Sequence, residues 1–244
     1  SNTWSSIYAA AEISTGEIFL GTYKSSNAEM IKVSNSGSFV WSKNWNPILG
    51  GNTFYEIYQK SDGEIFFMLY DTNTGAASIN SIDSDGNIIW SNSASALYQD
   101  ITELNDGSLI GHQFSRSFTS ISPTGSINWN TNIQQSNAEV MYHSDLLALS
   151  SGDFIIIGMT GSSFSTDGKT IYMMRYTSAG NQLWYKQYKT KNVFDFWDAY
   201  AFTMSEDSAG NIIISLNDND NDGNGPINTG VFKVDSSDGT KLLP

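Results

Sequence analysis

Short runs of alternating apolar and polar residues dominate the hydrophobic pattern of this chain. Ile31-Lys32-Val33 and Phe232-Lys233-Val234 show an apolar residue on either side of a polar one. Successive side chains of a β-strand leave opposite faces, so this alternation predicts strands with one buried face. No stretch keeps the apolar period of about 3.6 residues that a packed helix needs. The pattern therefore predicts an all-β protein.

The predicted strands recur in five repeats, each marked by two glycines and a large apolar residue. A first glycine precedes a short apolar run in every repeat, at Gly16, Gly63, Gly107, Gly152 and Gly210. A second glycine follows at Gly37, Gly86, Gly125, Gly180 and Gly239. Four residues beyond the second glycine stand Trp41, Trp90, Trp129, Trp184 and Leu243. Self-similarity at such a spacing is typical of a repeat architecture.

Each repeat is expected to contain four strands. One lies before and one after the first glycine, and one lies before and one after the second. In the first repeat we expect them at residues 7–14, 17–23, 29–34 and 38–44. Turns such as Asp83-Ser84-Asp85-Gly86 provide hairpin chemistry, with glycine at a positive φ. Four-stranded units of roughly 40–50 residues are too small to bury their faces alone and are typical of propeller blades. The predicted fold is a five-bladed β-propeller of four-stranded antiparallel blades.

We expect one domain over residues 1–244, with blades at approximately 7–45, 54–93, 97–132, 141–189 and 197–244. A solenoid or two sandwiches are the alternatives. A sandwich gives no reason for a tryptophan at one fixed offset, whereas equivalent blades offer each tryptophan an equivalent slot between blades. Trp4 joins the last blade in one version of ring closure, and residues 239–244 complete that blade alone in the other; the sequence leaves both open.

Charge and composition narrow the classes of partner. With 25 acidic and 12 basic residues the formal net charge is −13, which repels phosphate backbones and anionic lipids, so we expect no nucleic-acid partner. The longest apolar run, at 154–159, is far shorter than the roughly 20 residues that span a bilayer, so we expect no membrane insertion. The absence of cysteine excludes disulfides and thiolate sites. Abundant Ser, Asn, Thr and Gly favour an extracellular or cell-surface location.

The sequence around the second glycine resembles a known class of propeller repeat. Lys32-Val33-Ser34 and Lys233-Val234-Asp235, each followed by a glycine and the first also by Trp41, resemble the Lys-apolar-Asp-x-x-Gly-x-x-x-Trp propeller repeats of secreted and surface proteins of bacteria. The resemblance covers essentially the whole chain. It implies an extracellular adhesion, scaffold or binding role, including a place among other domains of a larger secreted protein. The repeats also look like those of quinoprotein dehydrogenases, but the vicinal cysteines often seen there are absent. Five-bladed lectins have a similar repeat length and aromatic richness, without a specific motif match.

A calcium loop is the sharpest local motif. The segment 218–223, Asp-Asn-Asp-Asn-Asp-Gly, alternates carboxylates before a glycine, which gathers hard oxygen ligands around one point. Pro226 and Thr229 occupy the ninth and twelfth positions, so the motif is incomplete and a solvated acidic loop is the alternative. The candidate calcium ligands are Asp218, Asp220, Asp222 and Asn224.

An aromatic residue leads the first strand of every repeat, at Tyr8, Tyr55, Tyr98, Tyr142 and Trp197. Acidic residues lie close by in sequence, at Glu56, Asp100, Asp145 and Asp198. The first strand of a propeller blade is the innermost, so these side chains are expected at one mouth of a central channel. Aromatic faces beside carboxylates suit sugars, which predicts a glycan or protein surface as partner. The alternative is that the aromatic rings only wedge between blades.

We expect no catalytic residues. His112 and His143 are the only histidines, and neither has a second ligand at zinc spacing. No Gly-x-Ser-x-Gly elbow is present. The prediction is a non-catalytic extracellular binding, adhesion or scaffold module that binds carbohydrate and calcium. A five-bladed glycoside hydrolase, which needs two carboxylates in one channel, and a virion or surface-filament protein are the alternatives, so the sequence leaves enzyme activity open.

Overall fold

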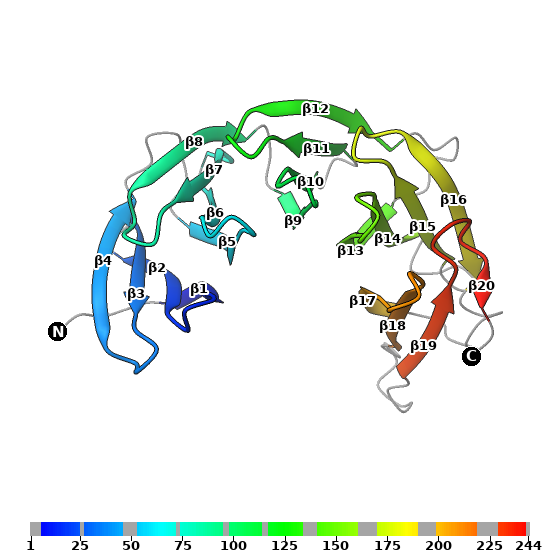
Figure 1. Cartoon of the computed structure of the whole chain (residues 1–244), viewed down its shortest axis with the longest axis horizontal. Coiled ribbons are helices and arrows are strands. Elements are labelled where there is room, and N and C mark those ends of the chain that lie inside the picture. Colours follow the sequence, from blue (N-terminus) through cyan, green and yellow to red (C-terminus); the bar gives the residue numbers. More distant parts are fainter. Residues whose placement is uncertain are drawn as a thin grey trace. The chain divides into compact units, whose positions relative to one another are not determined.

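Five antiparallel sheets of four strands each form the computed structural model of the chain (Figure 1). Its described residues contain no helix, so the predicted all-β class is confirmed. The described residues are 6–24, 27–45, 53–71, 74–94, 98–113, 117–133, 141–160, 170–189, 199–218 and 229–242.

In each sheet the strands follow one another in chain order. The first sheet contains β1 (Ser6–Glu12), β2 (Ile18–Lys24), β3 (Asn27–Val33) and β4 (Phe39–Trp45). The second contains β5 (Thr53–Gln59), β6 (Ile65–Tyr70), β7 (Ala77–Ile82) and β8 (Ile88–Ala94). The third contains β9 (Tyr98–Glu103), β10 (Leu109–Gln113), β11 (Ser117–Ile121) and β12 (Ile127–Asn132).

The remaining two sheets are built in the same way. The fourth contains β13 (Met141–Ala148), β14 (Phe154–Thr160), β15 (Thr170–Tyr176) and β16 (Gln182–Lys189). The fifth contains β17 (Ala199–Glu206), β18 (Ile212–Asp218), β19 (Thr229–Val234) and β20 (Lys241–Leu242).

The chain divides into two compact units. The first unit comprises Ser1–Leu97 and Ile121–Ile127, and the second comprises Tyr98–Ser120 and Asn128–Pro244. The first unit therefore holds the first two sheets with the turn between β11 and β12, and the second unit holds the rest. The prediction of a single domain with the blade limits given above stays a prediction.

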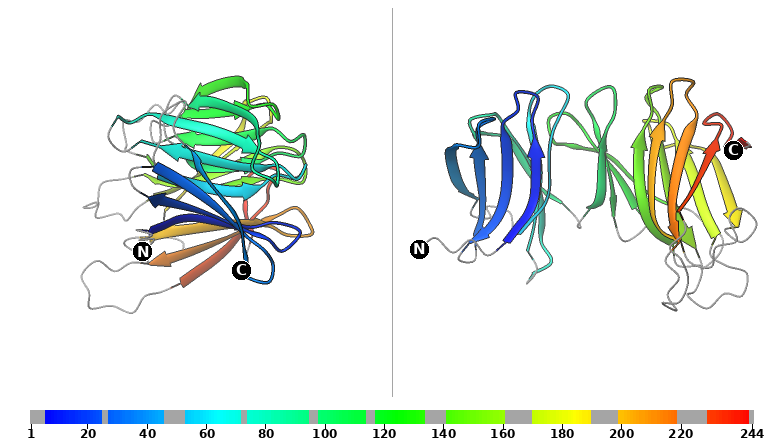
Figure 2. Two further views of the ribbon diagram at one scale, coloured as in Figure 1. Left: turned by 90° about the vertical axis from the view of Figure 1, so that its left-hand side faces the viewer. Right: turned by 90° about the horizontal axis from the view of Figure 1, so that it is seen from below.

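Nine of the ten repeat glycines close hairpins of one design, and Gly239 closes a loop that is one residue longer. In the first hairpin the Gly16 N–H donates to the Ile13 carbonyl at 2.8 Å, and the Ile13 N–H donates to the Glu17 carbonyl at 2.9 Å. Gly16 has a φ of 80°, which completes a three-residue loop that only glycine adopts without strain. The expected strand over 7–14 therefore ends earlier, because Ser14 belongs to this turn. The hairpins that carry the repeat glycines lie at one end of each sheet (Figure 2).

The hydrophobic core of each unit lies between neighbouring sheets. In the second unit Ile155 and Ile157 of β14 pack with Ile212 and Ile214 of β18, and all four are 0% exposed. The alternate residues of β14, including Phe154, pack toward the third sheet. A middle strand thus buries both of its faces, which explains why β14 has a continuous apolar run rather than an alternating one.

Each repeat tryptophan lies against the second glycine of the next repeat. A Cβ added to Gly86 would lie 2.9 Å from the Trp41 ring, and one added to Gly180 would lie 3.2 Å from Trp129. The predicted equivalent slots are thus present. The four tryptophans are half-buried rather than core residues, because their strands form the outer edge of each sheet. No helix in the described ranges has the length and apolar character to cross a membrane.

Candidate functional site

A bulge interrupts the first strand of every sheet near the same place. The pairing of β1 with β2 shifts between Ile7 and Ala9, and that of β5 with β6 shifts between Phe54 and Glu56. Equivalent shifts occur in the third, fourth and fifth sheets. A bulge places one extra residue in the strand and redirects its side chain. In the first two sheets the extra residues are Tyr8 and Tyr55.

The first unit exposes these two tyrosines on neighbouring strands. Tyr8 is 50% exposed and Tyr55 is 42% exposed, and β1 lies next to β5 (Figure 1). Ile7 beside Tyr8 is 61% exposed. Glu56, the residue after the second bulge, is half-buried. The structure therefore brings three predicted site residues, Tyr8, Tyr55 and Glu56, onto one pair of strands.

In the second sheet the bulge separates a buried aromatic side chain, Phe54, from an exposed one, Tyr55. Phe54 is 1% exposed, and its ring fills the space over Gly21, where an added Cβ would lie 2.5 Å from it. Without the extra residue, the side chains on one side of the bulge would shift to the opposite face of the strand.

Tyr98 does not join the exposed tyrosines. It is fully buried, with its ring over Gly111 in β10. Burial raises the pKa of its hydroxyl, whereas the polar side chains of Thr119 and Gln113 lower this pKa. Tyr98 pairs with Gln113 and Asp100 pairs with His112, so the extra residue of this strand is Gln99. Tyr98 therefore corresponds to Phe54, and its expected place at a channel mouth is wrong.

Several predicted site residues fall outside the described part of the chain. Tyr142 lies in β13 and Asp218 ends β18, but their side chains are not described. The other residues outside the described ranges are Trp197, Asp198, Asp220, Asp222 and Asn224. Among the side chains that are described, no group of three or more acidic or histidine residues is placed to hold a metal ion. Calcium binding therefore stays a prediction.

Asp100 and Asp145 come together in the second unit, each just after a bulge. Asp145 accepts hydrogen bonds from the Leu146 N–H at 3.1 Å and, across to β17, from the Met204 N–H at 2.6 Å. Asp100 accepts from the N–H groups of Ile101 and Leu146. The two carboxylates therefore connect the first strands of three successive sheets.

Burial governs the ionisation of this pair. It raises the pKa of Asp100 to about 6, against the hydrogen bonds from Ile101 and Leu146. It also raises the pKa of Asp145 to about 6, and the negative charge of Asp100 adds to the rise. Desolvation and a neighbouring like charge both disfavour a carboxylate. The pair can take up protons in mildly acidic conditions while its oxygens hold neighbouring strands.

Comparison with known proteins addresses the fold. No protein-family model and no curated protein sequence matches the chain. A Lactobacillus plantarum protein is 12% identical, with a TM-score of 0.61 over 99% of this chain and 71% of that one. The Dos1 propeller is 14% identical, with a TM-score of 0.54 over 100% of this chain and 61% of the other. YCF48 bound to D1 peptide is 10% identical, with a TM-score of 0.55 over 96% and 66%.

The chain has a β-propeller fold with five four-stranded blades. The structural neighbours support this fold alone, because propellers at such low identity share architecture without sharing chemistry. Only the residues of this chain can therefore indicate its function.

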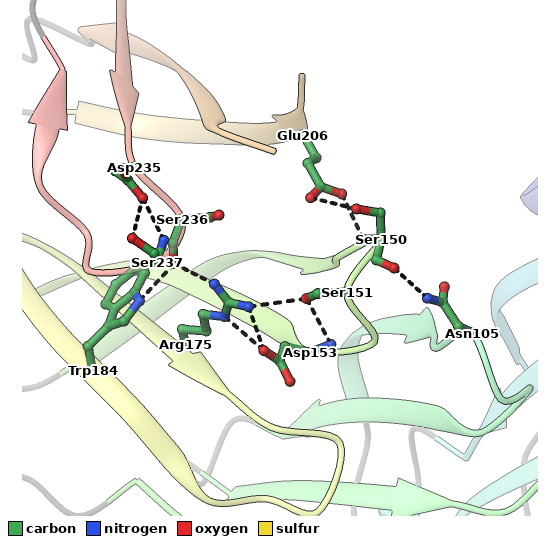
Figure 3. Close-up of polar contacts among 10 residues, drawn as sticks. All are labelled: Asn105, Ser150, Ser151, Asp153, Arg175, Trp184, Glu206, Asp235, Ser236 and Ser237. Atoms are coloured by element: carbon green, nitrogen blue, oxygen red, sulfur yellow. Dashed lines mark hydrogen bonds and ion pairs between the residues drawn. The ribbon is translucent and has the colours of Figure 1, made fainter. Parts of the chain in front are cut away.

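Polar bridges between successive blades were missed at the level of sequence. In the fourth blade Arg175 pairs with Asp153 at 2.6 Å and donates to the Ser236 carbonyl of the fifth blade at 2.7 Å (Figure 3). The Trp184 indole N–H donates to the same carbonyl at 2.9 Å. In the first blade Lys32 makes the equivalent bridge, to Glu17 at 2.9 Å and to the Ser84 carbonyl of the second blade at 3.0 Å. A cation five residues before the second glycine is the signal that marks these bridges.

A second type of bridge joins the turns of the first glycines. The N–H and hydroxyl of Ser150 donate to Glu206 at 2.7 and 2.9 Å, and Asn105 donates to the Ser150 carbonyl at 2.8 Å (Figure 3). In the first unit the Ser14 N–H donates to the Gln59 side chain at 2.7 Å. Gln59 and Glu206 both stand four residues before a first glycine. These contacts are repeat features of blade packing rather than a ligand site.

Proposed function

We propose that this propeller is a non-catalytic binding module whose ligand surface includes the inner strands of the first two blades. The observation that carries the proposal is the exposure of Tyr8 and Tyr55, at 50% and 42%, on equivalent bulges of neighbouring strands. Bulges that turn large aromatic rings toward solvent are not required for blade packing, because Phe54 fills the core position beside them. A binding role gives these exposed rings a function.

A glycan is the ligand class that we propose for this surface. Tyrosine offers an apolar ring face for the C–H groups of a sugar and a hydroxyl that bonds to sugar hydroxyls. Glu56 follows Tyr55 directly and adds a hydrogen-bonding carboxylate. An extracellular location and calcium binding belong to the same proposal and rest on composition and on the 218–223 motif.

The hydrogen bonds of Asp100 and Asp145 indicate a structural role for these two carboxylates rather than a catalytic one. The two oxygens of Asp145 accept from the N–H groups of Leu146 and Met204, and Asp100 accepts from those of Ile101 and Leu146. A glycosidase needs one carboxyl group free to protonate the glycosidic oxygen and another free to attack or activate water. Oxygens engaged by the backbone of neighbouring strands are poorly placed for either step.

Glycan binding can be tested by titration with matched variants. We expect a glycan array to yield ligands for the wild-type protein, and we expect Tyr8→Ala and Tyr55→Ala each to weaken their binding about tenfold, as measured by calorimetry. Phe39→Ala is the control, since Phe39 is 66% exposed on the outer strand β4. No array signal, or equal losses for Phe39→Ala, contradicts the proposal. Because YCF48 is bound to a peptide, a peptide library run in parallel identifies a protein ligand instead.

A glycoside hydrolase is the second candidate, favoured by one observation. Asp100 and Asp145 have pKa values of about 6, a range that suits a general acid near neutral pH. Incubation with a polysaccharide panel tests this candidate. Product release by the wild type and not by Asp100→Asn would establish it in place of the binding module.

A further inference from the structure

A second pair of tyrosines lies at the same end of the first two blades as the bulge tyrosines. Tyr23 of β2 pairs with Ser6 at the start of β1, and Tyr70 of β6 pairs with Thr53 at the start of β5. Tyr23 and Tyr70 are both half-buried. Each of these two blades therefore has one tyrosine in the bulge of its first strand and one at the end of its second strand.

The two tyrosine positions are equivalent from one repeat to the next. Tyr8 and Tyr55 stand eight residues before the first glycine of their repeats, and Tyr23 and Tyr70 stand seven residues after it. In the other three repeats the first position holds Gln99, Ser144 and Phe202, and the second holds Phe114, Met159 and Asn217. The tyrosines are therefore a property of the first unit, which contains both of these blades. Blade folding does not require them, because the other three blades form without them.

The repetition of these tyrosines indicates a ligand with more than one sugar unit. The strands β1 and β5 are neighbours (Figure 1), so adjacent blades carry the two sets of rings. One tyrosine ring stacks against the face of one sugar unit. Equivalent rings on neighbouring blades therefore provide two subsites for one chain of sugar units, whereas a single sugar occupies one subsite at a time.

The two subsites differ in the residue that follows the bulge. This residue is Ala9 in the first blade and Glu56 in the second. A carboxylate accepts hydrogen bonds from sugar hydroxyl or amide N–H groups, and it repels another carboxylate. The formal net charge of −13 acts in the same direction at longer range. The second subsite therefore favours a neutral sugar unit over an acidic one.

We propose that this surface binds a neutral oligosaccharide that places one sugar unit on each of the first two blades. The inference rests on the proposed glycan-binding function and adds the length and charge class of the ligand. The ligand has at least two sugar units and no carboxylate or sulfate group. Linking the two contacts in one molecule raises the affinity, because the second contact then forms within the complex.

A length series tests the two subsites. The probes are oligomers of glucose, mannose, galactose and N-acetylglucosamine, from one to about six units long, titrated by nuclear magnetic resonance. We expect at least one series to bind, with an affinity that rises about tenfold or more from the monomer to the longest oligomer. Tyr8→Ala and Tyr55→Ala each keep one subsite, so we expect each to reduce this gain to about threefold or less. Phe39→Ala, on the outer strand β4, is the control and should keep the full gain.

Oligomers of galacturonic acid of the same lengths test the charge class. We expect the wild type to bind them at least about tenfold more weakly than the neutral oligomers, and Glu56→Gln to reduce this difference. Glu12→Gln is the matched control, because it removes the same charge from an exposed position at the far end of β1. An unchanged difference in Glu56→Gln, or tighter binding of the acidic series by the wild type, would overturn the charge class.

The outcomes separate this inference from the function on which it rests. No binding by any probe would contradict glycan binding itself, and the two-subsite surface with it. Equal affinities for monomers and longer oligomers would leave a glycan-binding module and overturn the two-subsite surface. The same holds if the tyrosine variants keep the full dependence on length. Circular dichroism checks that each variant is folded.

Discussion

The indole N–H of Trp129 donates a hydrogen bond to the carbonyl oxygen of Ser178, at 3.1 Å, in the turn of the following blade. Trp90 makes the same bond to Pro123 at 3.0 Å. Trp41 differs, because its buried Nε1 has no hydrogen-bond partner among the described residues. The equivalent carbonyl, that of Ser84, accepts from Lys32. Four similar tryptophans thus include one that packs without a hydrogen bond.

This difference predicts unequal effects of replacing tryptophan by phenylalanine. Trp129→Phe loses packing and a hydrogen bond, whereas Trp41→Phe loses packing and relieves an unsatisfied N–H group. We expect Trp129→Phe to lower the free energy of unfolding by about 1 kcal/mol more than Trp41→Phe, measured by urea titration. Equal losses in the two variants would mean that the bond to Ser178 contributes nothing.

The Asp100–Asp145 pair predicts a specific pH dependence. Each carboxyl has a pKa of about 6 in the folded protein, above the ordinary value of 3.8, so the folded state binds more protons between these values. The contribution of the pair to stability is therefore present below about pH 4, falls as the pH rises, and is constant above about pH 7. Asp145→Asn keeps an oxygen that accepts from Met204 and removes the charge.

We expect Asp145→Asn to unfold at a higher temperature than the wild type at pH 8, by the equivalent of about 1 kcal/mol, and at the same temperature at pH 4. Other carboxylates, including Asp207, titrate in both proteins and cancel in the difference. Asp85→Asn, at an exposed turn position, is the control and should show no such difference. Thermal unfolding at the two pH values measures it, and a variant that is less stable at pH 8 would refute the explanation.

The blades were predictable because their determinants are local. The glycine spacing and the alternation of apolar residues predicted four strands for each repeat, and the structure confirms them. The side-chain environments were harder to predict. Tyr8 and Tyr55 stand eight residues before the first glycine of their repeats, whereas Tyr98 stands nine residues before Gly107. The bulge position of that strand is therefore taken by Gln99, and the Tyr98 ring lies in the core. An aromatic residue near the start of a strand was thus not enough, because its offset from the glycine decides whether it occupies the bulge.

Contacts between blades were harder to predict from the sequence than contacts within one blade. The partner of Arg175 in the next blade is a main-chain carbonyl, that of Ser236, which any residue type would supply. Asp100 and Asp145 lie near each other, but their hydrogen bonds to Leu146 and Met204 depend on how neighbouring strands are offset. The sequence shows that Asp100 and Asp145 carry carboxylates, but it does not show which N–H groups their oxygens accept.

Lys60 gives a prediction about a buried charge. Its side chain is 0% exposed and pairs with Asp62 at 2.7 Å and Glu64 at 2.9 Å. Ile13, Leu104 and Leu149 occupy the corresponding turn position in other blades and are buried. Lys60→Leu alone leaves Glu64 without its cation, and we expect a loss of about 3 kcal/mol.

The double variant Lys60→Leu with Glu64→Gln should recover more than half of that loss, because no buried charge then lacks its partner. Urea unfolding of the four proteins of this cycle measures the coupling. If the single and double variants lose equal stability, Lys60 stabilises its blade through packing of its methylene groups and not through the ion pair.

The second glycines predict which turns tolerate a side chain. Gly37 and Gly86 both have a positive φ, of 82° and 75°, so alanine at either position costs about 1 kcal/mol in backbone strain. At Gly86 the new Cβ would also lie 2.9 Å from the Trp41 ring, whereas at Gly37 no described atom lies within 4 Å. We therefore expect Gly86→Ala to lower the melting temperature clearly more than Gly37→Ala, with the difference disappearing when Trp41 is replaced by alanine. A difference that persists without Trp41 would show that turn strain, and not the contact between blades, reserves this position for glycine.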